Sequence, residues 1–355
     1  MKKLLFATCC IAFLSGSLGA AAQKKSAAKN VLTQTLKGKS WSADNGNGTF
    51  TNPLFYDEFS DPDIIRVGED YYLAGTTMHS VPGLVVLHSK DLVNWEFSSY
   101  CFDRLDDSDD FNLRNGKEAY GQGIWAPAIR YHNGKFYIFS NINGHGLQVY
   151  ISDSAKGPWT HHKVNGDIYD LSVLFDEDGK IYAVHKYGNV TVTELKPDLS
   201  GPVEGSSKVV IPEGNAMGEG HHIYKINGMY YILSADYSPM GRMQCARSKS
   251  IWGPYETCVI SERESYGYAA GWSVGNMGIG RPLPEDGFSF QNNMPNGLNL
   301  GCATIHQGGI VQAPDGKWWG VSMQDFNAVG RTVCLSPVTW VDGWPYFGLE
   351  KNLGR

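Results

Sequence analysis

Three acidic residues and one histidine stand at similar distances before aromatic-rich segments of the chain. Asp61, Asp170, Glu219 and His306 lie 11 to 13 residues before the last aromatic residue of the hairpin that follows each of them. Isolated acids in strands are normally exposed, because burying an unpaired carboxylate is costly. If the fold brings these four side chains together, the cluster is of the kind that proteins usually keep for chemistry.

The segments that would position these side chains repeat along the chain. Each has a turn glycine followed by an aromatic-rich strand. Glycine accepts the positive φ of a tight turn, and the aromatic and aliphatic residues after it suit a strand buried between stacked sheets. The five copies are at residues 68–73, 134–138, 179–183, 228–232 and 316–320.

Five such repeats, some tens of residues apart, predict an all-β fold, a five-bladed β-propeller. A two-sheet sandwich is the alternative, but it does not explain why the same hairpin returns. The first strand of every propeller blade lines the central channel, so equivalent positions converge on one axis. The count back from each hairpin gives the equivalent positions Asp61, Ala126, Asp170, Glu219 and His306.

Short segments around these positions form an ordered set of motifs. They are Asp-Pro-Asp at 61–63, Trp-Ala-Pro at 125–127, Asp-Leu-Ser-Val-Leu-Phe-Asp-Glu-Asp-Gly-Lys at 170–180 and Glu-Gly-His-His-Ile-Tyr-Lys at 219–225. In this order, and with later matches through Trp344, the chain resembles family 43 of the glycoside hydrolases over nearly all of residues 50–348. His221 departs from the family pattern, since many members have proline there.

The resemblance implies an inverting hydrolase with three catalytic carboxyl groups. Asp61 would be the general base that activates water, and Glu219 the general acid that protonates the leaving oxygen. Asp170 would orient Glu219 and raise its pKa. Burial and a neighbouring carboxylate can keep the acid protonated near neutral pH. In an inverting enzyme the acid and the base stand about 6.5–9.5 Å apart, which leaves room for the water.

Four further residues have one functional and one structural interpretation each. Trp125 offers a stacking face for a sugar ring or packs within its blade. Arg331 resembles a substrate-contacting arginine, and a surface salt bridge is the alternative. His222 either binds substrate beside Glu219 or fills space in its strand. His306 is either linked through water to a central ion, as in the family, or is hydrogen-bonded in the core.

The expected reaction requires no cofactor. The resemblance leaves room for a structural calcium or sodium ion at the propeller axis near His306, although one nitrogen ligand alone is a poor site for a hard cation.

The start of the chain is typical of an exported protein. Lys2 and Lys3 precede an apolar run that ends near Gly19, and small residues follow, so residues 1–22 are predicted to be a signal peptide. The apolar run is too short for a membrane span. Residues 23–45 form a polar lead-in, and residues 46–355 the catalytic propeller. We therefore expect a periplasmic or extracellular protein.

The composition of the chain limits the kinds of molecule that it is expected to bind. The net charge of −6 argues against nucleic acid and suits a neutral glycan. Five cysteines remain after signal cleavage, an odd number without CxxC spacing, and buried thiols in strands are the expected state. Residues 264–300 form a long insertion, and we expect its Tyr266, Tyr268, Trp272 and Phe288 to line part of the substrate pocket.

The expected substrate is a plant cell-wall glycan. Residues 330–331 and the segment 337–344 resemble the exo-acting β-xylosidases and α-L-arabinofuranosidases of the family, which release a pentose from arabinoxylan, xyloglucan or their oligosaccharides. Many of these enzymes continue into a C-terminal β-sandwich domain, which we expect to be either absent from the protein or not included in this sequence. An endo-arabinanase and a non-catalytic glycan-binding propeller are the alternatives.

Overall fold

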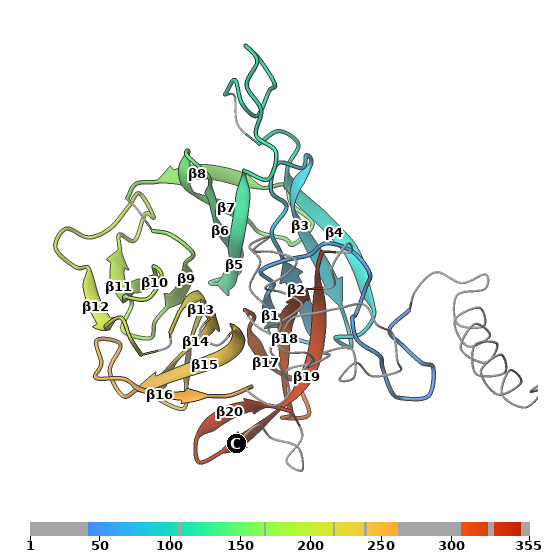
Figure 1. The fold of residues 1–355 in the computed structure, drawn as a ribbon, viewed down its shortest axis with the longest axis vertical. Coiled ribbons are helices and arrows are strands. Elements are labelled where there is room, and N and C mark those ends of the chain that lie inside the picture. The colour runs from blue at the N-terminus through green and yellow to red at the C-terminus, as the bar shows by residue number, and fades with distance from the viewer. Residues whose placement is uncertain are drawn as a thin grey trace, which may run out of the picture. The chain divides into compact units, whose positions relative to one another are not determined.

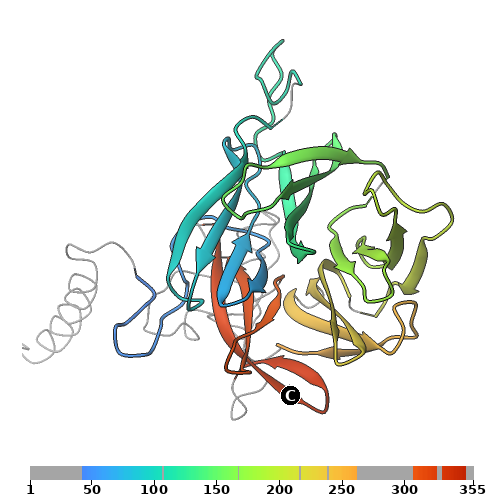
Figure 2. The ribbon, with the colours of Figure 1, turned by 180° about the vertical axis from the view of Figure 1, so that it is seen from behind.

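The computed structural model describes residues 42–105, 108–166, 168–215, 217–237, 240–261, 307–325 and 330–348. Within these ranges the chain forms strands and no helix, arranged as five four-stranded sheets. Figure 1 shows the sheets around a common axis, and Figure 2 shows the same ring of sheets from behind. The predicted all-β, five-bladed propeller is confirmed.

Each blade consists of four strands that follow one another in the chain and pair antiparallel with their neighbours. The first blade contains β1 (Asp63–Val67), β2 (Asp70–Ala74), β3 (Gly83–Ser89) and β4 (Trp95–Phe102), and the second contains β5 (Ile124–His132), β6 (Lys135–Ile142), β7 (Gly146–Ser152) and β8 (Thr160–Val164). The third contains β9 (Ser172–Phe175), β10 (Ile181–His185), β11 (Val190–Leu195) and β12 (Lys208–Ile211). The fourth contains β13 (Glu219–Ile226), β14 (Met229–Tyr237), β15 (Met240–Ser248) and β16 (Glu256–Val259), and the fifth contains β17 (Ile310–Gln312), β18 (Trp318–Asp325), β19 (Arg331–Val341) and β20 (Trp344–Phe347).

The five repeated hairpins join the first and second strands of the blades, as predicted. Their turn glycines all have positive φ, at Gly68, Gly134, Gly179, Gly228 and Gly316. Because the first strand lies innermost in every blade, the five first strands together line the axis (Figure 1).

The hydrophobic core is divided among the spaces between neighbouring blades. One cluster packs the first blade on the second, and three others join the second to the third, the third to the fourth and the fourth to the fifth. A fifth cluster, which includes Ile64, Leu73, Val321 and Val333, joins the fifth blade to the first. Burial of apolar side chains on both faces of a sheet therefore closes the ring of blades.

The segment just before the first blade fastens the ring where its two ends meet. Leu54 donates its backbone N–H to Val333 at 2.8 Å, and Phe59 donates to the carbonyl of Arg331 at 2.7 Å. The Asn52 side chain accepts from and donates to the backbone of Leu335, at 2.8 and 2.9 Å. These contacts hold the segment that leads to Asp61 against β19, which begins with Arg331.

Several predictions from the sequence fall outside the described residues. They concern the signal peptide, most of the polar lead-in and the insertion at 264–300. Where the structure is described, it contains no helix long and apolar enough to cross a membrane. The four described cysteines lie in strands, and Cys101, Cys245 and Cys334 are buried, as expected of structural thiols.

Candidate active site

A β-bulge at the start of the innermost strand shapes the candidate site. In the second blade Trp125 pairs with Asn141 and Ala128 with Phe139, so two residues lie opposite one. In the fourth blade Glu219 pairs with Ala235 and His222 with Leu233, with the same irregularity between them. Bulges of this kind redirect side chains and are frequent beside active sites.

The position of the bulge shows which residues are equivalent in the five blades, and it differs from the sequence count at one of the acids. One residue per blade has positive φ at this point, and these residues are Asp61, Ala126, Asp170, Gly220 and Gln307. Asp61 and Asp170 are therefore equivalent, as predicted. Glu219 is not their equivalent but stands one residue earlier, at the position of Trp125 and Tyr169. His306 likewise precedes the positive-φ residue of its blade, and it lies outside the described residues.

Asp61 is held by a threonine and lies beside an arginine. The side chain is largely buried, and its Oδ2 accepts the Thr76 hydroxyl at 2.5 Å. Thr76 Oγ1 also accepts the backbone N–H of Ala126 at 2.9 Å, which links the first blade to the second. On the other side, Arg331 Nη1 lies 3.6 Å from Asp61 Oδ1. The carboxylate thus has a fixed orientation, as a general base requires.

Asp170 is buried and makes a structural contact with the next blade. Its Oδ2 accepts the backbone N–H of Gly220 at 2.6 Å. Gly220 has a φ of 67°, and a Cβ there would lie 2.4 Å from the Gln307 side chain, so the position requires glycine. Asp170 therefore fixes the backbone next to Glu219, which agrees with the orienting role expected of it.

Glu219 lies in surroundings that favour its protonated form. Burial and then the charge of Asp61 raise its pKa, against the opposing effects of a hydrogen bond from Tyr169 and the charge of Arg331. The Tyr169 hydroxyl donates to Glu219 Oε2 at 3.0 Å. A carboxyl group whose pKa is raised in this way can donate a proton near neutral pH.

Neighbouring carboxyl groups raise the pKa values of both Asp170 and Glu219. Burial, followed by the charges of Glu219 and Asp61, raises the pKa of Asp170 well above its ordinary value. Besides burial, the charge of Asp61 raises the pKa of Glu219. The two roles expected of Asp170, orienting Glu219 and raising its pKa, both stay predictions.

Beneath these acids, a buried ion pair links four blades. Asp63, which is fully buried, accepts a hydrogen bond from the backbone of Ile129 at 2.9 Å and forms an ion pair with Arg130 at 2.5 Å. Arg130 also donates to Ser172 of the third blade. His222 Nδ1 of the fourth blade lies 3.0 Å from the other oxygen of Asp63. Burial alone would raise the pKa of Asp63, but Arg130 and His222 lower it below its ordinary value.

The remaining predicted residues occupy different surroundings. His222 is buried against Asp63, which favours its structural interpretation, and substrate contact stays a prediction. Trp125 is partly buried at the position equivalent to Glu219, and its indole Nε1 donates to the Gly121 carbonyl oxygen at 3.2 Å. Among the described residues, no group of three or more His, Cys, Asp or Glu side chains is arranged to hold a metal ion. His306 lies outside the described residues, and the ion near it stays a prediction.

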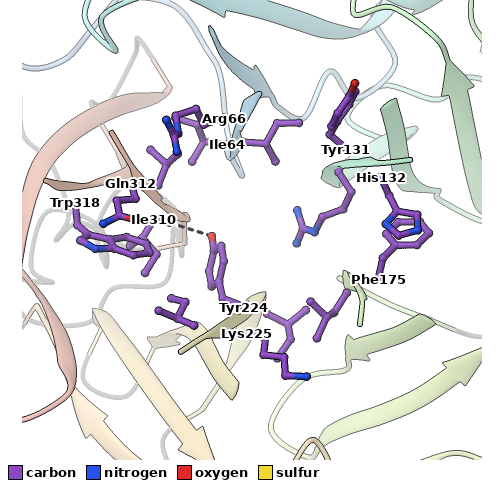
Figure 3. Close-up of a pocket in the computed structure, with 16 residues that line it drawn as sticks. Ile64, Arg66, Tyr131, His132, Phe175, Tyr224, Lys225, Ile310, Gln312 and Trp318 are labelled. Carbon is purple, nitrogen blue, oxygen red and sulfur yellow. Dashed lines mark hydrogen bonds between the residues drawn. The ribbon is translucent and has the colours of Figure 1, made fainter. Parts of the chain in front are cut away.

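A cavity of about 390 Å³ opens at the opposite end of the axis (Figure 3). It lies between the far ends of the innermost strands and is lined by aromatic and cationic side chains that include Arg66, His132, Lys225 and Trp318. In Figure 3 the Tyr224 hydroxyl points to Ile310, whose N–H it accepts at 2.9 Å. The acids stand at the beginnings of these strands, so this cavity is separate from the candidate site.

The position of Arg331 requires glycine at residue 330, and this leads to a first prediction. A Cβ on Gly330 would lie 1.8 Å from Glu58 Oε2, the oxygen that accepts the Arg331 N–H at 2.7 Å. We expect Gly330→Ala to displace Arg331 and to raise KM by about tenfold, the loss of roughly one charged hydrogen bond. Gly316→Ala is the matched control, because Gly316 has a similar φ of 86° and no neighbour within 4 Å. Equal KM values in the two variants would contradict the dependence.

The fold and the site together define a five-bladed β-propeller with a cluster of carboxyl groups at one end of its axis. Comparison with known proteins agrees with this description. The sequence profile of the glycosyl hydrolases family 43 matches residues 50–267, which is more than half of the chain. The chain therefore belongs to family 43 of the glycoside hydrolases.

Relatives and solved structures within the family resemble most of the chain. A β-xylosidase of Formosa agariphila is 30% identical over 93% of this chain and 56% of its own length. A non-reducing-end α-L-arabinofuranosidase of Bacteroides ovatus is 34% identical over 85% of this chain and 54% of its own. A bifunctional protein of Bacteroides eggerthii, with a GH43 part, superimposes with a TM-score of 0.70 at 34% identity, over 84% of this chain and 35% of that one. The chain spans little more than half the length of the first two relatives.

Proposed function

We propose that the chain is the catalytic propeller of an inverting, exo-acting glycoside hydrolase that releases a pentose from plant cell-wall glycans. The observation that carries the proposal is the cluster of Asp61, Asp170 and Glu219, in which the charges are coupled and the surroundings of Glu219 favour its protonated form. Membership of family 43 supports it, since the family acts on glycosidic bonds.

The proposed reaction is a single displacement at the anomeric carbon. Asp61 accepts a proton from water, and the water oxygen bonds to the anomeric carbon on the face opposite the leaving group. The bond from that carbon to the glycosidic oxygen breaks, and Glu219 gives its proton to that oxygen. Asp61 is then protonated and Glu219 ionised, and exchange with solvent restores both. Asp170 holds Gly220, and thereby the backbone that carries Glu219.

The sugar is proposed from the relatives. The two quoted above are named as a β-xylosidase and an α-L-arabinofuranosidase that acts at non-reducing ends. We therefore infer that the sugar released is β-D-xylose or α-L-arabinofuranose. We expect Arg331 to contact hydroxyl groups of that sugar, and its distance of 3.6 Å from Asp61 supports this role. The predicted signal peptide supports action outside the cytoplasm.

Parallel assays on two aryl glycosides test this proposal. We expect turnover of nitrophenyl β-D-xyloside, nitrophenyl α-L-arabinofuranoside or both. Proton NMR of the first-formed sugar should show the anomer of opposite configuration to the substrate, because water attacks once. Retention of configuration would contradict the single displacement. Binding of xylo- or arabino-oligosaccharides without turnover would indicate a glycan-binding propeller, and internal cleavage of linear arabinan an endo-arabinanase.

A further inference from the structure

Tyr169 occupies a distinctive place beside the candidate acid. It precedes Asp170, just as Glu219 precedes Gly220, so the two side chains project from equivalent positions of neighbouring blades. The Tyr169 hydroxyl donates to Glu219 Oε2 at 3.0 Å, while 41% of the residue remains exposed. Burial and the charge of Glu219 raise the pKa of Tyr169, so the hydroxyl keeps its proton and remains a donor.

The hydrogen bond occupies one of the two oxygens of Glu219. With Oε2 accepting from Tyr169, the proton that the reaction needs is directed to Oε1. When Glu219 gives up that proton, negative charge develops on the carboxyl group, and a hydrogen bond to a charged acceptor is stronger than one to a neutral acceptor. The contact therefore strengthens along the reaction, which is the condition under which it accelerates the chemical step.

The charged groups around Glu219 have opposite effects on its ionisation. Asp61, before β1, disfavours its ionised form, and Arg331, at the start of β19, favours it. Asp170, before β9, is coupled to Glu219 by charge. Tyr169 is the neutral donor among these described groups, and its effect does not depend on its own ionisation near neutral pH.

We propose that Tyr169 is a positioning residue that holds the Glu219 carboxyl group for proton delivery and stabilises the carboxylate that results. This inference rests on the proposed role of Glu219 as general acid. Through Glu219, Tyr169 acts on the leaving group, so its contribution depends on how much proton donation the leaving group needs.

The test compares Tyr169→Phe with wild type on two kinds of substrate. An unactivated oligosaccharide needs protonation of its leaving oxygen, whereas a nitrophenyl glycoside needs little. We expect kcat to fall about tenfold on the oligosaccharide and about twofold or less on the nitrophenyl glycoside, with KM nearly unchanged. Loss of the donor raises the pKa of Glu219 further, so the alkaline limb of the pH–activity profile should move to higher pH while the acidic limb stays in place.

A matched control and a second variant make each outcome decisive. Tyr131→Phe removes a hydroxyl from a residue of similar exposure, 43%, at the opposite end of the propeller, and should leave both substrates and both limbs unchanged. Equal losses on both substrates with an unmoved alkaline limb would overturn the proposal, as would a rise in KM alone. Full activity of Glu219→Gln on the oligosaccharide would instead remove the proposed acid itself.

Discussion

Glu219→Gln should lower kcat on an unactivated oligosaccharide by about 10²- to 10⁴-fold, the usual contribution of a positioned general acid. The amide has the shape of the carboxyl group and can still accept the hydrogen bond that Tyr169 donates at 3.0 Å. It has no proton to give at the required acidity. The loss should therefore fall on the chemical step, and steady-state kcat measured alongside KM would show it.

Asp61→Asn supplies the matched comparison. Asparagine keeps the contact with Thr76 but cannot accept a proton from water. Water must be activated whatever the leaving group is, so this variant should lose a comparable factor on oligosaccharide and nitrophenyl glycoside alike. Glu219→Gln should lose much less on the nitrophenyl glycoside, whose leaving group departs without a proton. The reverse pattern would exchange the roles of the two residues, and unchanged activity in both variants would sink the catalytic assignment.

The sequence predicted the blades because the signal is local. Turn glycine and aromatic strand lie within a few residues of each other, and each hairpin carries the pattern independently. In the first four blades the last aromatic residue of the hairpin lies two residues before the residue that pairs with the first regular position of the inner strand. Tyr72 thus precedes Ala74, the partner of Asp63, and Tyr231 precedes Leu233, the partner of His222. The aromatic residues are therefore a reliable starting point for counting back to the inner strand.

The same count was wrong by one residue at Glu219, for a physical reason. In the third blade the turn is longer, with Asp176 N–H donating to the carbonyl of Lys180, and this accounts for the extra residue between Asp170 and Tyr182. In the fourth blade Ile226 pairs with Met229, so the turn has only two residues and adds none to the count. The extra residue there is Glu219 itself, which stands before the positive-φ position. Counting residues back from the hairpin cannot show whether an extra residue lies in the turn or before the positive-φ residue at the bulge.

Two residues of the site needed the fold before they could be assigned. Thr76 fixes Asp61 and the second blade through contacts 15 and 50 residues away in sequence, and nothing near it marks it. Tyr169 stands beside Asp170 in the sequence, yet its partner is 50 residues away. The motifs thus indicated which acids do chemistry, while the groups that hold them became visible only through contacts between blades.

The buried pair of Asp63 and Arg130 gives the largest expected effect on stability. Asp63→Asn removes the charge that Arg130 and His222 both face, and leaves the arginine, which is only 12% exposed, without its partner. Removing one member of a buried ion pair costs about 3–5 kcal/mol, because the remaining charge stays desolvated. We expect the free energy of unfolding, measured in denaturant, to fall by that amount at neutral pH.

The dependence on pH has a definite sign. The pKa of Asp63 is lower in the folded protein than its ordinary value, so the folded state binds the proton less readily than the unfolded state. The stabilisation by Asp63 is therefore fully present above the unfolded pKa of about 3.9, and it disappears as the pH falls through the lower folded pKa. The difference between wild type and Asp63→Asn should accordingly narrow in acid.

Asp70→Asn is the control for this prediction. Asp70 also belongs to the first blade and forms ion pairs, with Lys90 at 2.6 Å and with His88, but it lies near the surface. Surface pairs contribute little, because solvent screens them and their side chains are costly to order. A loss in Asp63→Asn no greater than that in Asp70→Asn would contradict the view that this buried pair joins the blades beneath the acids. A large loss would mean that the two aspartates of Asp-Pro-Asp divide the work, Asp61 facing the substrate and Asp63 holding together the four blades beneath it.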